Sequence, residues 1–84
     1  MNITRPEQLS TFVKDYRMKQ SLTQTDIAKL VGIRVATISN FENRPETCKL
    51  ETVFKIMAAL NLRIDIATRS EEPAEGTPQW NEGW

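Results

Sequence analysis

The sequence of 84 residues predicts a mainly α-helical domain of four helices, followed by one β-strand and a disordered tail. Apolar residues recur every three or four positions in residues 6–20 and 50–60, which is the spacing of helices that bury one face. Between these segments, two shorter helical stretches meet at Gly32. After them, residues 62–66 alternate apolar and charged side chains, as is typical of a strand. A chain this short forms one domain, and a second chain often completes so small a core.

The first helix is expected over residues 6–20. Pro6 suits its first turn, because the N–H that proline lacks would have no partner there. The i, i+3, i+4, i+7 spacing predicts a core-facing stripe, which consists of Leu9, Phe12, Val13 and Tyr16.

The second helix is expected to begin after Thr23 and to run to about Val31. Thr23 is interpreted as its N-cap, with Asp26 three residues later as the partner of a capping box. Gly32 ends this helix, because a residue without a Cβ adopts the left-handed turn that a tight corner between helices requires.

The third helix is expected over residues 34–42, with two buried side chains one turn apart, Ile38 and Phe41. The segment NRPE at residues 43–46 then breaks the helix, since the residue before a proline is driven out of helical geometry. A fourth helix follows over about residues 50–60. Its apolar stripe repeats the spacing of the first and consists of Val53, Ile56, Met57 and Leu60.

Residues 62–69, LRIDIATR, place Leu62, Ile64 and Ile66 on one face, which predicts a β-strand. The sequence holds no second strand-like segment, so this strand needs another partner for its backbone donors and acceptors. Antiparallel pairing with the same strand of a second copy would provide one and would form a homodimer. The alternative is an extended strap packed on the helices.

Residues 70–84 are acidic, contain proline and glycine and lack apolar periodicity, so this tail is expected to be disordered in the free protein. Trp80 and Trp84 are unusual in such a segment, because exposed tryptophan is favoured where it anchors a partner. We interpret them as a partner-binding motif. The alternatives are that one tryptophan folds back onto the domain, or that the tail is a handle for proteolysis. The predicted organisation is a helical domain at 1–61, a dimerisation strand at 62–69 and the tail.

The composition argues against an enzyme and against a membrane protein. The chain has no histidine and a single cysteine, Cys48, so the usual metal ligands and the usual general base are missing. We therefore expect no catalytic residue, no cofactor, no metal and no small-molecule ligand. The longest apolar run, residues 56–60, is too short to cross a bilayer, and the first residues lack the apolar centre of a signal peptide. With the lone cysteine, these features favour a cytoplasmic protein.

The formal net charge is zero, but it is unevenly distributed. Residues 1–13 are neutral, residues 14–55 carry +3, residues 56–69 carry +1, and residues 70–84 carry −4. The mildly basic body is compatible with a nucleic-acid partner, although a bias of this size is also common on solvated faces.

The second helix, the corner at Gly32 and the third helix together predict a helix-turn-helix. In this motif the second helix of the pair enters the major groove of DNA, while the first crosses the backbone. Ala28 is small where the two helices must touch. The apolar seam consists of Ile27, Val31, Ile33, Ile38 and Phe41. The sequence therefore predicts DNA binding.

The third helix carries short side chains, which leave room for base edges to approach. The predicted base-reading residues are Arg34, Val35, Ala36, Ser39 and Asn40. An arginine suits guanine O6 and N7 or a phosphate, small apolar side chains suit a thymine methyl group, and hydroxyl or amide groups offer polar readout.

Two residues at the positive end of the second helix, Gln24 and Thr25, are placed to hold a phosphate. Thr37 is expected to pack or cap. Lys29 and Arg44 are interpreted as solvated charges near the DNA, with phosphate contact as the alternative.

The segment LTQTDIAKLVGIRVATISNFEN, residues 22–43, resembles the phage-repressor type of helix-turn-helix through its TQxxIA, GI and ISxFE elements. This resemblance covers residues 6–60. The whole chain, with its single strand and an acidic tail ending in tryptophan, resembles more narrowly the HipB-like antitoxins. The resemblance implies a homodimer that binds palindromic operator DNA in the nucleoid and represses its own operon. It also implies a second partner, a HipA-like Ser/Thr kinase toxin that the antitoxin binds and restrains.

In repressors of this kind, an arginine of the first helix pairs with the glutamate that ends the recognition helix. Carried over, this implies a structural pair of Arg17 and Glu42. The chain departs from the pattern at Val35, where HipB-like chains often have a polar residue, so an operator sequence does not carry over. Two alternatives stay open: a stand-alone repressor without a toxin, and a protein-interaction module that has lost DNA binding.

Overall fold

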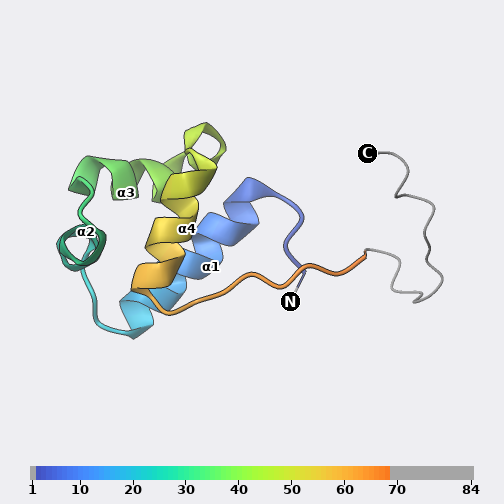
Figure 1. Ribbon diagram of the computed structural model, residues 1–84, viewed down its shortest axis with the longest axis horizontal. Helices are drawn as coiled ribbons and strands as arrows, with labels where there is room; N and C mark the ends of the chain where they lie inside the picture. The colour runs from blue at the N-terminus through green and yellow to red at the C-terminus, as the bar shows by residue number, and fades with distance from the viewer. Residues whose placement is uncertain (1, 69–84) are drawn as a thin grey trace.

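The structure is a computed structural model that describes residues 2–68. Four α-helices follow one another in this part of the chain (Figure 1): α1 (Pro6–Lys19), α2 (Gln24–Val31), α3 (Val35–Asn43) and α4 (Leu50–Ala59). A 3-10 turn, η1 (Pro45–Thr47), connects α3 to α4. The predicted mainly α class is confirmed, and the helix bounds agree with the expected ones to within one residue.

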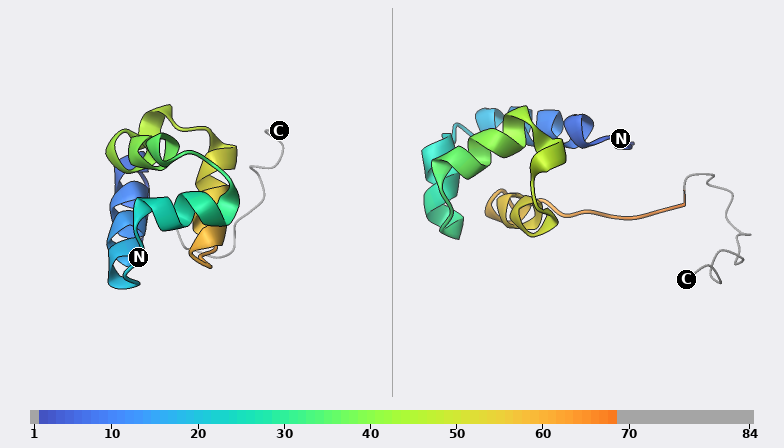
Figure 2. Two further views of the ribbon diagram at one scale, coloured as in Figure 1. Left: turned by 90° about the vertical axis from the view of Figure 1, so that its left-hand side faces the viewer. Right: turned by 90° about the horizontal axis from the view of Figure 1, so that it is seen from above.

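The helices form two pairs that cross each other. Figure 2 shows α1 and α4 standing apart, with α2 and α3 across one end of both. Helix α2 packs against α3 and α4, while α1 packs against α3 and η1. The helix-turn-helix pair therefore sits on a base made by the first and last helices.

The core lies where the four helices meet. Its buried apolar side chains are Val13, Ile27, Ala28, Ile38, Phe41, Val53, Ile56, Met57 and Leu60. The predicted stripe of α4 and both predicted residues of α3 are buried as expected. One member of the α1 stripe differs, because Phe12 is 37% exposed and stacks its ring on Tyr16 instead of entering the core.

The N-terminal end of α2 confirms the predicted capping box. The backbone N–H of Asp26 donates to Oγ1 of Thr23 at 3.0 Å, and the backbone N–H of Thr23 donates to Oδ2 of Asp26 at 2.9 Å. The hydrogen bonds from the Thr23 backbone and side chain lower the pKa of Asp26. This cap fixes the point at which the helix-turn-helix begins.

Three helices end in the same way, with one residue in the left-handed region followed by an apolar residue that folds back. The left-handed residues are Ser21 (φ 61°), Gly32 (φ 72°) and Asn61 (φ 60°). The residues that follow them, Leu22, Ile33 and Leu62, each donate a backbone hydrogen bond to a carbonyl five residues earlier and pack on the core. This is the Schellman arrangement, which satisfies free carbonyls and closes the end of the core. The sequence predicted it at Gly32 and missed it at the two non-glycine positions.

Residues 62–68 extend from the end of α4 as an orange segment in Figure 1. Within the described residues they belong to no helix or strand. Leu62 packs on the core, whereas Ile64 is 43% and Ile66 is 91% exposed. The predicted strand depends on pairing with a second copy, so it stays a prediction. Trp80 and Trp84 lie outside the described residues.

Candidate nucleic-acid interface

The N-terminal turn of α3 carries the predicted base-reading residues toward solvent. Arg34 is the extended N-cap of the helix (φ −83°, ψ 150°) and is exposed. Val35 and Ala36, the first two helical residues, are also exposed. The helix begins here with free backbone N–H groups, so one cation and two small apolar side chains surround a positive helix end.

The next two predicted readers are partly engaged within the protein. Nδ2 of Asn43 donates to Oγ of Ser39 at 3.2 Å, and Nδ2 of Asn40 donates to Oγ1 of Thr47 at 3.0 Å. The hydroxyl of Thr47 in turn donates to the Arg44 carbonyl. Asn40 therefore joins α3 to η1, a role that the sequence did not suggest.

Gln24 and Thr25 occupy the first turn of α2, where a phosphate site was predicted. Thr25 is exposed, but Gln24 is half-buried, and its Nε2 donates to Oε1 of Glu42 at 3.0 Å. The structure thus places the Gln24 side chain against the end of α3. No local sequence pattern indicates this contact, because the two residues are 18 positions apart.

Arg17 and Glu42 form the buried pair that the family resemblance implied. Nε of Arg17 donates to Oε2 of Glu42 at 2.7 Å, and Nη2 donates to Oε1 at 3.1 Å. The side chains are only 11% and 3% exposed. Nη1 of Arg17 donates to the Leu22 carbonyl at 2.7 Å. One guanidinium therefore joins α1, the loop before α2 and the last turn of α3.

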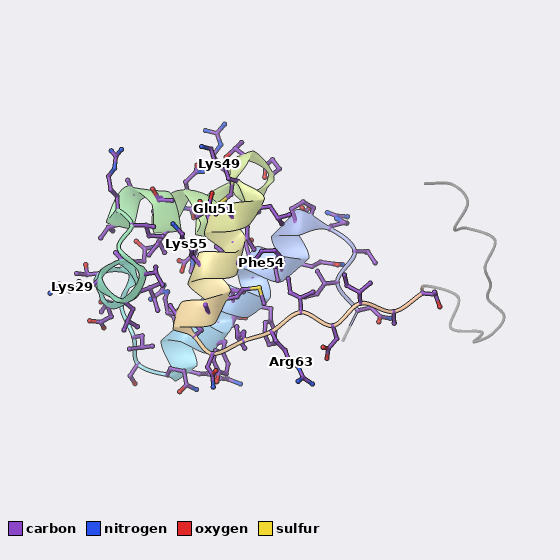
Figure 3. All side chains as sticks on the ribbon, viewed as in Figure 1. Lys29, Lys49, Glu51, Phe54, Lys55 and Arg63 are labelled. Atoms are coloured by element: carbon purple, nitrogen blue, oxygen red, sulfur yellow. The ribbon has the colours of Figure 1, made fainter. Side chains whose placement is uncertain are left out.

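Further cations lie on the elements next to α3. Figure 3 labels Lys29 on α2 and Lys49 at the start of α4. Lys49 and Arg44 are exposed and lie before α4 and after α3. Lys49 was not singled out from the sequence, although its position directly before a helix was the available signal.

Three further features of the described residues concern metal binding, the reactivity of the cysteine and membrane-spanning helices. Residues 2–68 hold no group of three or more His, Cys, Asp or Glu side chains placed to bind a metal ion. Burial raises the pKa of the Cys48 thiol, which disfavours its reactive thiolate form. No helix in this part of the chain is long and apolar enough to cross a membrane.

Comparisons with known proteins point to one family. The helix-turn-helix family model matches residues 13–66. The chain is 40% identical over 82 residues to the antitoxin HipB of Escherichia coli K12, covering 98% of this chain and 93% of that protein. It is 33% identical over 60 residues to the antitoxin HigA1 of Mycobacterium tuberculosis H37Rv, covering 71% of this chain and 40% of that one.

Two solved structures share the fold closely. A structure described as a HipA-HipB-O2-O3 complex has a TM-score of 0.81 at 40% identity, covering 82% of this chain and 97% of that chain. A structure described as a HipB-O4 20mer complex has a TM-score of 0.80 at 40% identity, with the same coverage.

We predict that Glu42→Ala lowers the free energy of unfolding by about 3–5 kcal/mol, because it leaves the guanidinium of Arg17 buried without its carboxylate. Urea denaturation of the purified chain measures this loss. The double variant Arg17→Met with Glu42→Leu is the matched control, and it should recover most of the stability because it removes both charges. A loss below about 1 kcal/mol in Glu42→Ala would mean that the pair behaves like an exposed one.

Proposed function

Because the chain belongs to the helix-turn-helix family and, within it, to the HipB antitoxins, we propose that it is a DNA-binding antitoxin without catalytic activity. It binds palindromic operator DNA as a homodimer, represses its own operon, and binds and restrains a HipA-like Ser/Thr kinase toxin. It acts in the cytoplasm. The observation that carries this proposal is the exposed N-terminal turn of α3, in a fold that matches a HipB-O4 20mer complex at a TM-score of 0.80.

We assign base reading to the first turn of α3 and phosphate contact to the residues around it. Arg34 donates to guanine O6 and N7, while Val35 and Ala36 lie against thymine methyl groups. Ser39 and Asn40 add polar contacts farther along the helix. Thr25 and the amide end of α2 hold a phosphate, and Gln24, fixed by Glu42, orients that end.

We propose that the homodimer forms along α4 and the segment after it. Leu50 and Phe54 are 67% and 51% exposed and lie one turn apart on α4, where Figure 3 labels Phe54. Ile64 and Ile66, in the segment that follows α4, are 43% and 91% exposed. Antiparallel pairing of the 62–69 strands of two copies would cover these side chains and satisfy the strand backbone. Such a dimer presents two α3 helices to half-sites about 34 Å apart.

We assign the kinase contact to the tail, through Trp80 and Trp84. Aromatic side chains of this size are the usual anchors of protein interfaces. A relative is known from a HipA-HipB-O2-O3 complex, in which both partners are present together with DNA. A kinase contact through residues 70–84 would not use the proposed DNA-binding surface of α3.

We predict that Arg34→Ala weakens operator binding by about 1–3 kcal/mol, through loss of one base contact. Fluorescence anisotropy with the operator upstream of the gene measures the affinity at several salt concentrations. Arg5→Ala is the matched control, because Arg5 is an exposed arginine outside α2 and α3 and pairs with Glu7. Equal affinities for the two variants would contradict the assignment, and an affinity of the unmodified chain that does not fall with salt would contradict DNA binding itself.

We predict that Ile66→Asp converts the dimer to monomers, because it places a charge in the proposed strand interface. Analytical ultracentrifugation at micromolar concentration measures the oligomeric state. Ala67→Asp adds the same charge on the opposite face of the strand and should leave the dimer intact. A dimer that survives Ile66→Asp, or that both variants disrupt equally, would exclude the proposed register.

We predict that deletion of residues 70–84 preserves operator affinity and weakens binding to the kinase encoded beside this gene. Co-expression followed by pull-down and calorimetry measures the second effect. Replacement of both Trp80 and Trp84 by serine in the full chain should reproduce it. A deletion that lowers operator affinity instead would show that the tail supports the DNA-binding domain.

A further inference from the structure

Charged and apolar side chains alternate along residues 62–66, in the segment that follows α4. Nε of Arg63 lies 3.4 Å from Oδ1 of Asp65, so these two side chains share one side of the segment. They are 86% and 76% exposed, and Figure 3 shows Arg63 pointing away from the helices. Because side chains of an extended chain alternate, Leu62, Ile64 and Ile66 share the other side. Of these three, Leu62 packs on the core, whereas Ile66 is 91% exposed.

Two copies of this segment can form a symmetric antiparallel pair in only a few registers. Directly opposite residues of an antiparallel pair point to the same face of the sheet. The two-fold axis must therefore pass through a residue that faces its own copy, because a register shifted by one residue in one strand would mix the apolar face with the charged face. The candidate centres are residues 63, 64, 65 and 66.

The charges distinguish these registers. A centre at Ile64 places Arg63 opposite Asp65 of the second copy and, by symmetry, Asp65 opposite Arg63. A centre at residue 63 or 65 places Arg63 or Asp65 opposite itself, and like charges directly opposite each other are destabilising. A centre at Ile66 places Ile64 opposite Thr68 and gives up an apolar pair. Of the four centres, Ile64 alone pairs both the charges and the apolar side chains with suitable partners.

The register centred on Ile64 also accounts for the exposure of Ile66. In this register Ile66 lies opposite Leu62 of the second copy, which packs on the core of that copy. Each copy thus adds one apolar side chain to the edge of the other core, and the two Ile64 side chains meet on the axis. On the outer face, every charge has an opposite charge beside it along its own strand and another across the interface.

We propose that Arg63 and Asp65 form two reciprocal ion pairs across the two-fold axis, and that these pairs select a second copy of this chain, in the register centred on Ile64, as the partner of the segment. This inference rests on the homodimer of the proposed function. An exposed ion pair contributes little to affinity, so the role of these pairs is specificity. A chain with another order of charges would place like charges, or no charge, opposite Arg63 and Asp65, and would bind less well.

Exchange of the charges tests the pairing. Arg63→Glu gathers four carboxylates at the axis, and Asp65→Lys gathers four cations. We expect either variant alone to raise the dissociation constant of the dimer about tenfold or more. An equimolar mixture of the two variants should form a heterodimer close in stability to the unmodified dimer, because every charge again faces an opposite one. Analytical ultracentrifugation measures these constants, and the differences should shrink as salt is added.

Lys29→Glu is the matched control for this exchange. It makes the same change of charge as Arg63→Glu at an exposed position on α2, which lies away from Arg63 in Figure 3. It should leave the dissociation constant unchanged, and circular dichroism confirms that each variant is folded.

Cysteine cross-linking tests the register independently of charge. In a Cys48→Ser background, Ile64→Cys should form a disulfide between two copies under mild oxidation, because position 64 faces itself across the axis. Ile66→Cys is the matched control on the same face. Each position 66 lies two residues from the centre, so the two Cα atoms are about 13 Å apart along the strands, and a disulfide spans no more than about 7 Å. This variant should not cross-link.

Charge-exchanged variants that dimerise as tightly as the unmodified chain would overturn the proposed ion pairs. A mixture that does not recover the affinity, or an equal loss in Lys29→Glu, would overturn them as well. A cross-link at position 66, or none at position 64, would overturn the register. An unmodified chain that is monomeric at micromolar concentration would instead refute the homodimer of the proposed function, and this inference with it.

Discussion

The position of α3 depends on one buried ion pair, that of Arg17 with Glu42. A carboxylate only 3% exposed is tolerated in a protein of this size because the guanidinium meets both of its oxygens. The same guanidinium also binds the Leu22 carbonyl, so it fixes α1, α3 and the loop before α2 relative to one another. Apolar packing alone permits small sliding movements of helices, whereas paired hydrogen bonds permit one arrangement. Gln24 joins this pair through Glu42 and thereby links the start of α2 to the end of α3.

Because the Arg17–Glu42 pair holds α3 from its inner side, the outer surface of α3 is available for contact with a partner. The helix is held from behind by Ile38, Phe41 and Glu42, while the side chains of Arg34, Val35 and Ala36 at its start are exposed. Among the described residues, exposed apolar side chains include Leu50 and Phe54 on α4 and Ile64 and Ile66 in the segment that follows it. A domain this small buries a limited core, and exposed apolar side chains of this size are suited to an interface with a partner.

The sequence predicted the helices because local signals specify them: a capping box at Thr23, a glycine at the corner and a proline break after α3. It missed the left-handed ends at Ser21 and Asn61. Serine carries no distinctive signal for this conformation, whereas the asparagine after α4 was an available signal that was not used. Phe12 was assigned to the core by spacing alone, but its position at the edge of the stripe turns it outward. The contacts of Gln24 and Asn40 join separate elements, and periodicity carries no information about such contacts.

These contacts also bear on how much DNA one copy can read. Because Nδ2 of Asn40 and one acceptor position of the Ser39 hydroxyl are already bonded within the protein, the predicted readers without such a bond are Arg34, Val35 and Ala36. One cation and two small apolar side chains discriminate few base pairs, each by about 1–3 kcal/mol. A single copy would therefore bind DNA with low specificity. A symmetric pair of copies contacts two half-sites, which doubles the number of base pairs that are discriminated without adding residues to the chain. The marginal core and the short reading surface are independent physical reasons, and both favour a protein that acts as a dimer.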